Sequence, residues 1–382
     1  MRSEDIVEFV RDLYGCDSDI PLHAPVIGKD ESAYIGSALD SGFVSSIGQF
    51  VDEFELRVAS ATNSPRAVST VNGTAALHAS LVLAGVAPGD LVITQALTFV
   101  ATCNALYHMG AFPIFCDVSM ETLGLCPSSV ESFLGEFCAV DGDACIHRPS
   151  GRRVAAIVPM HTFGHPVELD KLLSISVEWC IPLVEDAAES LGSTYRGKST
   201  GTFGMLGALS FNGNKVITTG GGGMVLCSDV RLGERAKHIT TTAKTAIKYD
   251  FYHDVAGFNY RMPNINAALG CAQMKRLASI LSEKRNIAAH YRDFFRGSDL
   301  TFIDEPPAAT SNFWLNAVIC PSSEERDHIL EVTNNAGVQT RRVWDLMYNL
   351  PMYSRALRTD TPNSTFLRER LINLPSSARE AV

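Results

Sequence analysis

The sequence predicts an α/β protein in which helices cover both faces of a mainly parallel sheet, followed by a smaller C-terminal α+β domain. From about residue 66 to residue 229, short apolar runs alternate with helical segments. Continuous apolar strands of this kind are typical of sheets that are buried on both faces. The alternation stops near residue 240, where a long helical stretch follows. We therefore predict a large domain over residues 1–245, including an N-terminal segment, and a small domain over residues 246–382.

The strands expected in the large domain are short apolar runs bounded by turn residues or by helices. They cover residues 66–70, 91–94, 112–118, 154–160, 181–187, 207–211 and 222–228. Helices are expected over residues 73–86 and 98–110, the second with Thr98 as its N-cap and Gly110 as its stop signal.

The small domain is expected to begin with a long helix that Pro263 and Asn264 open and that reaches about Gly297. A strand, a helix and a second strand should follow, over residues 313–320, 323–337 and 338–344.

Composition excludes several classes of protein. The net charge of −10 argues against a nucleic-acid binder, because no basic stripe offsets it. The ten cysteines show neither CxxC pairs nor zinc-ligand spacing, and they are expected to be buried thiols in a reducing compartment. The first residues lack the apolar core of a signal peptide, and no run of about 20 apolar residues is present. We expect a cytoplasmic protein that binds no membrane.

Two groups of polar residues follow predicted strands, at the edge where open α/β sheets bind ligands. Gly73 and Thr74 follow Asn72 at the start of a helix, where free backbone N–H groups can bind a phosphate. An ordinary capped helix would look the same. Asp186 ends the run that begins at residue 181, and its carboxylate could pair with a pyridinium nitrogen. An acidic residue that interacts with a helix dipole is the alternative interpretation.

The third group, also at a strand end, contains Lys215 in the segment SFNGNK, followed by a run of four glycines at residues 220–223. A partly desolvated lysine in such a loop can act as a nucleophile, and Ser210 and Asn212 could donate to a phosphate. An exposed lysine in a surface turn is the alternative. The histidines at positions 161 and 165 are interpreted as packing residues and not as metal ligands.

The order of these groups resembles that of fold-type I pyridoxal-phosphate (PLP) transferases, and in particular the DegT/DnrJ/EryC1/StrS sugar aminotransferase family. The resemblance covers about residues 20–375, and its SFNGNK and TTGGGG forms look closest to the branch that acts on UDP-4-keto-6-deoxy-N-acetylhexosamine in legionaminic-acid-type pathways. The matching segments are residues 42–55, 71–81, 98–118, 160–170, 185–204, 210–225, 257–270 and 340–353.

The resemblance implies a role for each site residue. Lys215 would carry PLP as a Schiff base, and Asp186 would pair with the pyridine nitrogen. Phe99 would stack on the ring, and Glu189 would lie near the reactive side of the cofactor. The remaining residues match a phosphate pocket (Gly73, Thr74, Ser210 and Asn212), a phosphate contact from a neighbouring subunit (Asn259) and a substrate-facing C-terminal segment (Arg341 and Trp344). The N-terminal stretch around His23 could complete the wall of the substrate groove.

The implied reaction is transfer of an amino group from glutamate to C4 of a nucleotide-linked 4-keto-6-deoxy sugar by a homodimer with shared active sites. It would serve the synthesis of surface polysaccharides or nonulosonic acids. A dehydratase of the same fold is one alternative, although that branch has a histidine in place of Lys215. A PLP-binding regulatory protein without turnover is the other.

Overall fold

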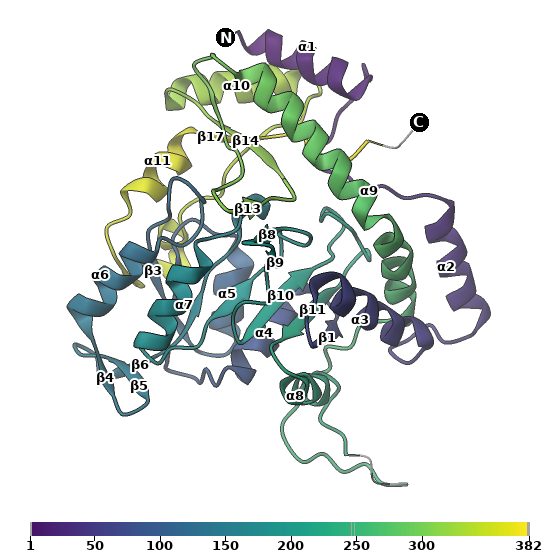
Figure 1. Ribbon diagram of the computed structural model, residues 1–382, viewed down its shortest axis with the longest axis vertical. Coiled ribbons are helices and arrows are strands. Elements are labelled where there is room, and N and C mark those ends of the chain that lie inside the picture. Colours follow the sequence, from purple (N-terminus) through teal and green to yellow (C-terminus); the bar gives the residue numbers. More distant parts are fainter. Residues whose placement is uncertain (1, 246, 248, 380–382) are drawn as a thin grey trace.

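The computed structural model describes residues 2–245, 247 and 249–379. It is a mixed α/β structure in which helices cover both faces of a central sheet, and the expected fold class is confirmed (Figure 1). The predicted domain boundary includes residue 246, which lies outside the described residues, and the division into two domains stays a prediction.

The strands of the central sheet arise from the predicted apolar runs. They are β1 (Arg66–Thr70), β2 (Leu91–Gln95), β3 (Phe112–Cys116), β6 (Arg152–Val158), β7 (Val184–Asp186), β10 (Leu206–Ser210) and β11 (Gly223–Cys227).

These strands form two hydrogen-bonded groups, one in the order β1-β11-β10-β7 and the other with β6, β2 and β3 side by side. Isolated parallel bridges from Ile157 to Leu183 and from Met160 to Asp186 join the groups between β6 and β7. β11 runs antiparallel to both of its neighbours, whereas β10 and β7, and β6, β2 and β3, pair in parallel. The expectation of a mainly parallel sheet is therefore confirmed, with β11 as an inserted antiparallel strand.

Alternate residues of the buried strands enter different cores, as the period of two requires. On β2, Val92 packs into the core beneath α4 (Gly73–Leu83) and α5 (Val100–His108), whereas Leu91 and Ile93 pack beneath α6 (Pro127–Phe137) and α7 (Leu169–Glu178). Both faces of the sheet are covered in this way, which explains why the strands read as continuous apolar runs.

The expected N-cap of α5 was wrong by one residue. Phe99 occupies the N-cap position, with extended backbone angles and no capping side-chain bond. The Thr98 hydroxyl lies 3.1 Å from that of Thr102 and donates to the sulfur of Met160, so it is not available to cap the helix. The expected stop signal is confirmed, since Gly110 follows the helix with φ +74°.

The C-terminal part of the chain follows the predicted order. The long helix α9 (Asn264–Phe295) begins after Pro263, and β14 (Asn316–Ile319) and α10 (Ser323–Asn335) follow. The last predicted strand is shorter than expected, because only Arg341–Arg342 (β15) pair in the ladder, opposite β17 (Leu371–Leu374). β12 (Thr301–Phe302), β14, β17 and β15 form the sheet of this region.

The N-terminal helix α1 (Ser3–Tyr14) packs with this C-terminal region and not with the central sheet (Figure 1). Its Ile6 and Val10 share a core with Tyr291 of α9 and Ile329 of α10. α2 (Lys29–Asp40) and α3 (Gln49–Thr62) contact α9 further along its length.

The remaining elements are short or peripheral: β4 (Cys138–Asp141), β5 (Ala144–His147), β8 (Thr194–Tyr195), β9 (Lys198–Ser199), α8 (Val230–Thr240), β13 (Ala309–Thr310), β16 (Leu357–Arg358), α11 (Pro362–Arg370) and three 3₁₀ turns (Thr162–Gly164, Met347–Asn349 and Pro351–Tyr353). Across the described residues, no helix combines the length and the apolar character that crossing a membrane requires.

Candidate active site

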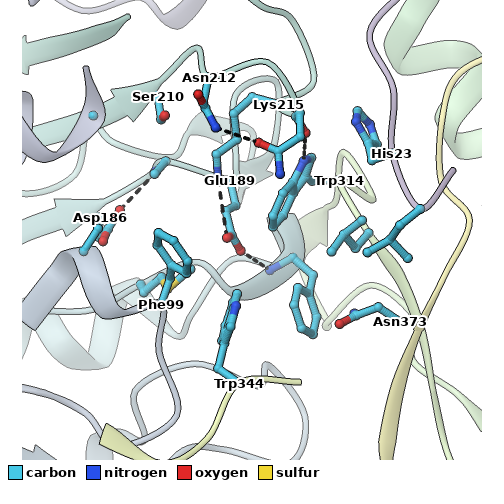
Figure 2. Close-up of a pocket in the computed structure, with 18 of the residues that line it drawn as sticks. His23, Phe99, Asp186, Glu189, Ser210, Asn212, Lys215, Trp314, Trp344 and Asn373 are labelled. Atoms are coloured by element: carbon cyan, nitrogen blue, oxygen red, sulfur yellow. Dashed lines mark hydrogen bonds and ion pairs between the residues drawn. The ribbon is translucent and has the colours of Figure 1, made fainter. Parts of the chain in front are cut away.

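A cavity of about 580 Å³ lies beyond the carboxyl ends of β1, β2, β7 and β10 (Figure 2). Parallel strands place their carboxyl ends at one edge of a sheet, which brings together residues from distant parts of the sequence. The predicted site residues that line it are His23, Gly73, Thr74, Phe99, Asp186, Glu189, Ser210, Asn212, Lys215, Arg341 and Trp344.

The first turn of α4 forms one end of the cavity. The side chain of Asn72 caps the helix by accepting from the backbone N–H of Ala75 at 2.8 Å. The N–H groups of Gly73 and Thr74 belong to the first turn, which leaves them without partners inside the helix. A Cβ atom on Gly73 would lie 2.7 Å from that of Ser210, so only glycine allows β10 to come this close. This turn could hold a phosphate group beside the Ser210 hydroxyl.

Asp186 lies at the other side of the cavity, at the end of β7. Its carboxylate accepts from the Thr102 hydroxyl at 2.7 Å and from the backbone N–H of Ala188 at 3.2 Å. Burial raises the pKa of Asp186, and these two donors oppose the rise. A cationic nitrogen placed beside this carboxylate would lower its pKa again and would in turn be kept protonated.

Lys215 and Glu189 face each other between these two ends. The Lys215 amine lies 3.5 Å from Glu189 Oε1, and the lysine side chain is 12 % exposed. Glu189 Oε2 accepts from the backbone N–H of Phe163 at 2.9 Å. Burial raises the pKa of Glu189 to about 7, although the nearby lysine favours the charged form. The pair therefore has a carboxyl group that can change protonation near neutral pH.

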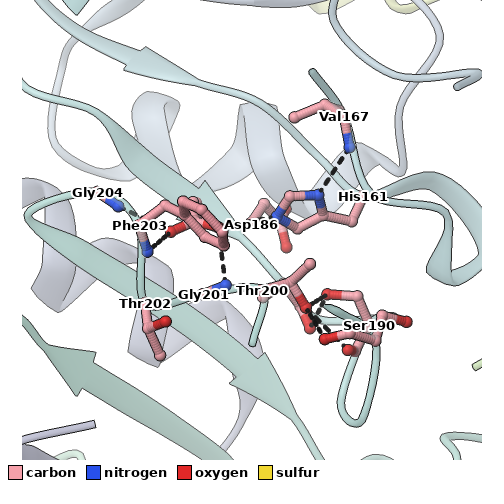
Figure 3. Close-up of polar contacts among 12 residues, drawn as sticks. His161, Val167, Asp186, Ser190, Thr200, Gly201, Thr202, Phe203 and Gly204 are labelled. Carbon is pink, nitrogen blue, oxygen red and sulfur yellow. Dashed lines mark hydrogen bonds and ion pairs between the residues drawn. The ribbon is translucent and has the colours of Figure 1, made fainter. Parts of the chain in front are cut away.

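Glu185, the residue before Asp186 on β7, binds the loop that includes Gly201, Phe203 and Gly204, which are labelled in Figure 3. Its carboxylate accepts from the backbone N–H groups of Gly201, Phe203 and Gly204 at 2.6–2.8 Å and contacts His161 Nε2 at 3.1 Å. Successive residues of a strand point to opposite faces of the sheet. Glu185 therefore points toward these backbone N–H groups, whereas Asp186 points into the cavity.

Aromatic side chains form a wall of the cavity. The ring of Trp344 lies 6.1 Å from that of Phe99 and 5.2 Å from that of Phe163, measured between centroids. Phe99 is 46 % exposed, which leaves a ring face open toward the cavity in Figure 2. Such a face could stack on a flat heterocycle.

The two adjacent arginines of β15 differ in their surroundings. Arg342 donates to Asp327 at 2.6 Å, whereas Arg341 forms no ion pair with any residue that the structure describes. Both arginines line the cavity, and Arg341 lies opposite Asn373, another lining residue, in the β15–β17 ladder. Arg341 is thus the better candidate for an anionic ligand.

His23 lines the cavity, and one of its ring nitrogens contacts a buried lysine. Its Nε2 atom lies 2.9 Å from the amine of Lys284, which is buried. Burial and the charge of Lys284 hold the pKa of His23 well below its usual value. A neutral imidazole is therefore expected at this position.

Asn259 does not line the cavity. It is exposed on the loop between α8 and α9, where its side chain accepts from Arg261 Nε at 2.9 Å. Its predicted contribution to the site of a neighbouring subunit stays a prediction.

The structure adds two residues that the sequence did not single out. Thr102 holds Asp186, and Trp314 lies beside Lys215 with its ring centroid 4.0 Å from the amine. The sequence around these residues does not indicate a role in the site, because Thr102 lies in a predicted helix and Trp314 in a predicted strand. Among the described residues, no cluster of side chains has the arrangement of a metal site.

Comparisons of the sequence and of the structure with known proteins find aminotransferases or GDP-perosamine synthases that are similar to this chain. The model of the DegT/DnrJ/EryC1/StrS aminotransferase family matches residues 25–380. GDP-perosamine synthases from Escherichia coli O157:H7 and Vibrio cholerae are 34 % and 32 % identical to the chain. Each match covers 94 % of this chain, and the two matches cover 93 % and 94 % of the respective synthases. The crystal structure of the aminotransferase TlmJ from Streptoalloteichus hindustanus superposes with a TM-score of 0.85 at 27 % identity, covering 94 % of both chains.

Proposed function

Because the chain belongs to the DegT/DnrJ/EryC1/StrS aminotransferase family, whose members depend on PLP, we propose that it transfers an amino group from glutamate to C4 of a nucleotide-linked 4-keto-6-deoxy sugar. The observation that carries this proposal is the Lys215 amine 3.5 Å from Glu189, in a cavity that Asp186, Arg341 and Trp344 also line.

The residues at the site fit the cofactor. The first turn of α4 and the Ser210 hydroxyl suit its phosphate, because the backbone of Gly73 approaches β10 as only glycine can. At the other side, the buried carboxylate of Asp186 suits a protonated ring nitrogen. When bound, PLP supplies the carbonyl that accepts the amino group and an electron-withdrawing ring.

The chain's own side chains have three tasks in this proposal. Asp186 keeps a negative charge beside the ring nitrogen. The Lys215 amine, once released, holds and returns the proton that moves at the reacting carbon. Glu189 keeps that amine within 3.5 Å and can hold a proton itself near neutral pH.

The substrate end of the cavity supports a phosphorylated ligand. Arg341 has a guanidinium group that no described carboxylate neutralises, and such a group binds diphosphate or carboxylate oxygens in a fork geometry. Trp344 and Phe99 present ring faces that suit a sugar. The motifs favour a UDP-linked N-acetylhexosamine, whereas the names of the relatives favour a GDP-linked sugar.

The test is turnover of glutamate with GDP- and UDP-linked 4-keto-6-deoxy sugars, followed by mass spectrometry and NMR of the product. We expect an amine at C4 of one of these sugars and little reaction with pyruvate or oxaloacetate. Elimination of a sugar hydroxyl would favour the dehydratase alternative, and a yellow protein without turnover would favour the regulatory one. Equal efficiency with a simple keto acid would overturn the sugar assignment.

A matched pair of variants tests the role of Arg341. Arg341→Ala should raise KM for the nucleotide sugar about tenfold, since one charge-assisted contact is lost. Arg342→Ala should leave KM nearly unchanged, because that side chain is already paired with Asp327. The same change in both variants would show that Arg341 has no special role.

A further inference from the structure

Residues 311–314, between β13 and β14, connect the two loops that carry the reactive side chains. All of these residues (Ser311, Asn312, Phe313 and Trp314) are buried. They precede the strand that enters the C-terminal sheet, and Trp314 lines the cavity (Figure 2).

Asn312 holds the loop that follows Asp186. Its Nδ2 atom donates to the carbonyl oxygens of Glu189 and Leu191, both at 2.9 Å. Its backbone N–H donates to Ser193 Oγ at 2.9 Å. A Cβ atom on Gly164 would lie 1.8 Å from Asn312 Oδ1, so a glycine is needed where the amide passes. The backbone of Glu189 is therefore fixed from the side of residue 312.

Trp314 holds the loop that carries the lysine. Its indole N–H donates to the carbonyl oxygen of Asn214, the residue before Lys215, at 2.7 Å. The Lys215 amine lies 4.0 Å from the centroid of the same ring. The indole therefore contacts both the backbone of this loop and its charged end, where a cation over the ring face is attracted.

The backbone between these two residues adopts an unusual conformation. Phe313 has φ +46°, in the left-handed region that residues with a Cβ atom rarely adopt. The backbone N–H of Trp314 donates to Asn312 Oδ1 at 2.8 Å, which closes the turn. This turn directs Asn312 to one loop and Trp314 to the other.

A buried lysine fixes the turn from behind. The amine of Lys284 on α9 donates to the carbonyl oxygens of Trp314 and Ser376 at 3.1 and 2.6 Å and contacts His23 Nε2 at 2.9 Å. The ring of His23 lies 6.4 Å from that of Trp314. The N-terminal segment, α9 and the C-terminal segment thus meet at the backbone of Trp314.

We propose that residues 311–314 form a clamp that sets the Lys215 amine against Glu189, with Trp314 as the positioning residue for the lysine. The inference rests on the proposed role of Lys215 as the cofactor-bearing residue. The clamp fixes the backbones of both loops, and the indole gives the free amine a defined place whenever it is not bonded to the cofactor.

The experiment uses cofactor-free protein and no sugar. PLP is added to the wild type, Trp314→Phe, Trp314→Leu and the control Trp179→Leu, which replaces the tryptophan that follows α7 and is not part of the cavity lining. The rate at which the visible imine band appears is measured at fixed pH. Borohydride reduction and peptide mapping confirm that Lys215 is labelled, and visible circular dichroism reports the geometry of the bound chromophore.

We expect Trp314→Leu to slow imine formation about fivefold and to change the visible circular dichroism, since both indole contacts are lost. Trp314→Phe should fall between the wild type and Trp314→Leu, because it keeps a ring face but loses the N–H bond to Asn214. Trp179→Leu should stay within about twofold of the wild type.

Rates and spectra of both Trp314 variants equal to those of the wild type would overturn the clamp. If Trp314→Leu does not fold, the decision rests on Trp314→Phe, where a wild-type rate and spectrum would overturn it and slower imine formation would support it. A wild type that forms no imine on Lys215 would instead refute the proposed function, so the two failures can be told apart.

Discussion

Replacing Glu189 with glutamine should remove a specific pH dependence from the stability of the cofactor-free protein. Glu189 is 2 % exposed, and burial raises the pKa of its carboxyl group to about 7, compared with an ordinary value of 4.5. A carboxyl group whose pKa is raised in the folded state binds a proton that the unfolded chain has already released. The free energy of unfolding therefore falls as the pH rises from about 4.5 to about 7, and it levels off above that range.

The size of the effect follows from the pKa difference. The interval between 4.5 and about 7, at about 1.4 kcal/mol for each pH unit, corresponds to about 3 kcal/mol. Glutamine has nearly the same shape, can still accept from the Phe163 N–H, and does not titrate. The wild type should therefore lose about 3 kcal/mol relative to Glu189→Gln between pH 4.5 and pH 8.

Urea-induced unfolding of both proteins, at equal concentration and at several pH values, measures this difference. Other buried groups titrate in both proteins, so their contributions cancel when one curve is subtracted from the other. A constant difference across the pH range would show that Glu189 does not take up a proton in the fold. A difference that grows in favour of the wild type with rising pH would show that the Lys215 charge outweighs burial.

Three further outcomes are expected. Glu185→Gln should lower the free energy of unfolding by about 3 kcal/mol, because one buried backbone N–H loses its acceptor and faces an amide N–H₂ group instead. Urea-induced unfolding measures this change, and Glu178→Gln at an exposed position is the control. Asp186→Asn should keep the fold, checked by circular dichroism, but lower kcat at least a hundredfold, because the charge beside the ring nitrogen is lost; a near-normal rate would contradict its role. Mixing Lys215→Ala with Asn259→Ala should restore activity if Asn259 acts across subunits, whereas no recovery despite demonstrated subunit exchange would count against it.

The central sheet could be predicted from the sequence because its strands are buried on both faces. The run at residues 66–70, with the buried Ala67 and Val68 at its centre, became β1 with the expected bounds. Thr98 shows where local rules fail. Its hydroxyl has the chemistry of a helix cap, but in the fold it contacts Thr102 and Met160, and no property of the neighbouring residues indicates that choice.

The candidate site could be predicted as far as strand ends determine it. Gly73, Asp186 and Lys215 follow different strands, and a mainly parallel sheet brings such positions to one edge. Trp314 is different, because it contacts Asn214 across 100 residues through a turn with a left-handed phenylalanine. That contact depends on how the C-terminal region packs against the sheet, and a local pattern cannot encode it.

The surroundings of the two acids in the cavity suggest that they have different tasks. Asp186 is held by the Thr102 hydroxyl and the Ala188 amide, and neither donor loses its proton near neutral pH. Among the described residues, Asp186 therefore has no hydrogen-bonded partner with which to exchange a proton, and its contribution is a charge in a fixed place. Glu189 faces the amine of Lys215 at 3.5 Å, and both of these groups can hold or release a proton. We infer that the proton that the site can move is carried by Lys215 or Glu189 and not by Asp186. The turn at Trp314 contacts the loops of both Lys215 and Glu189.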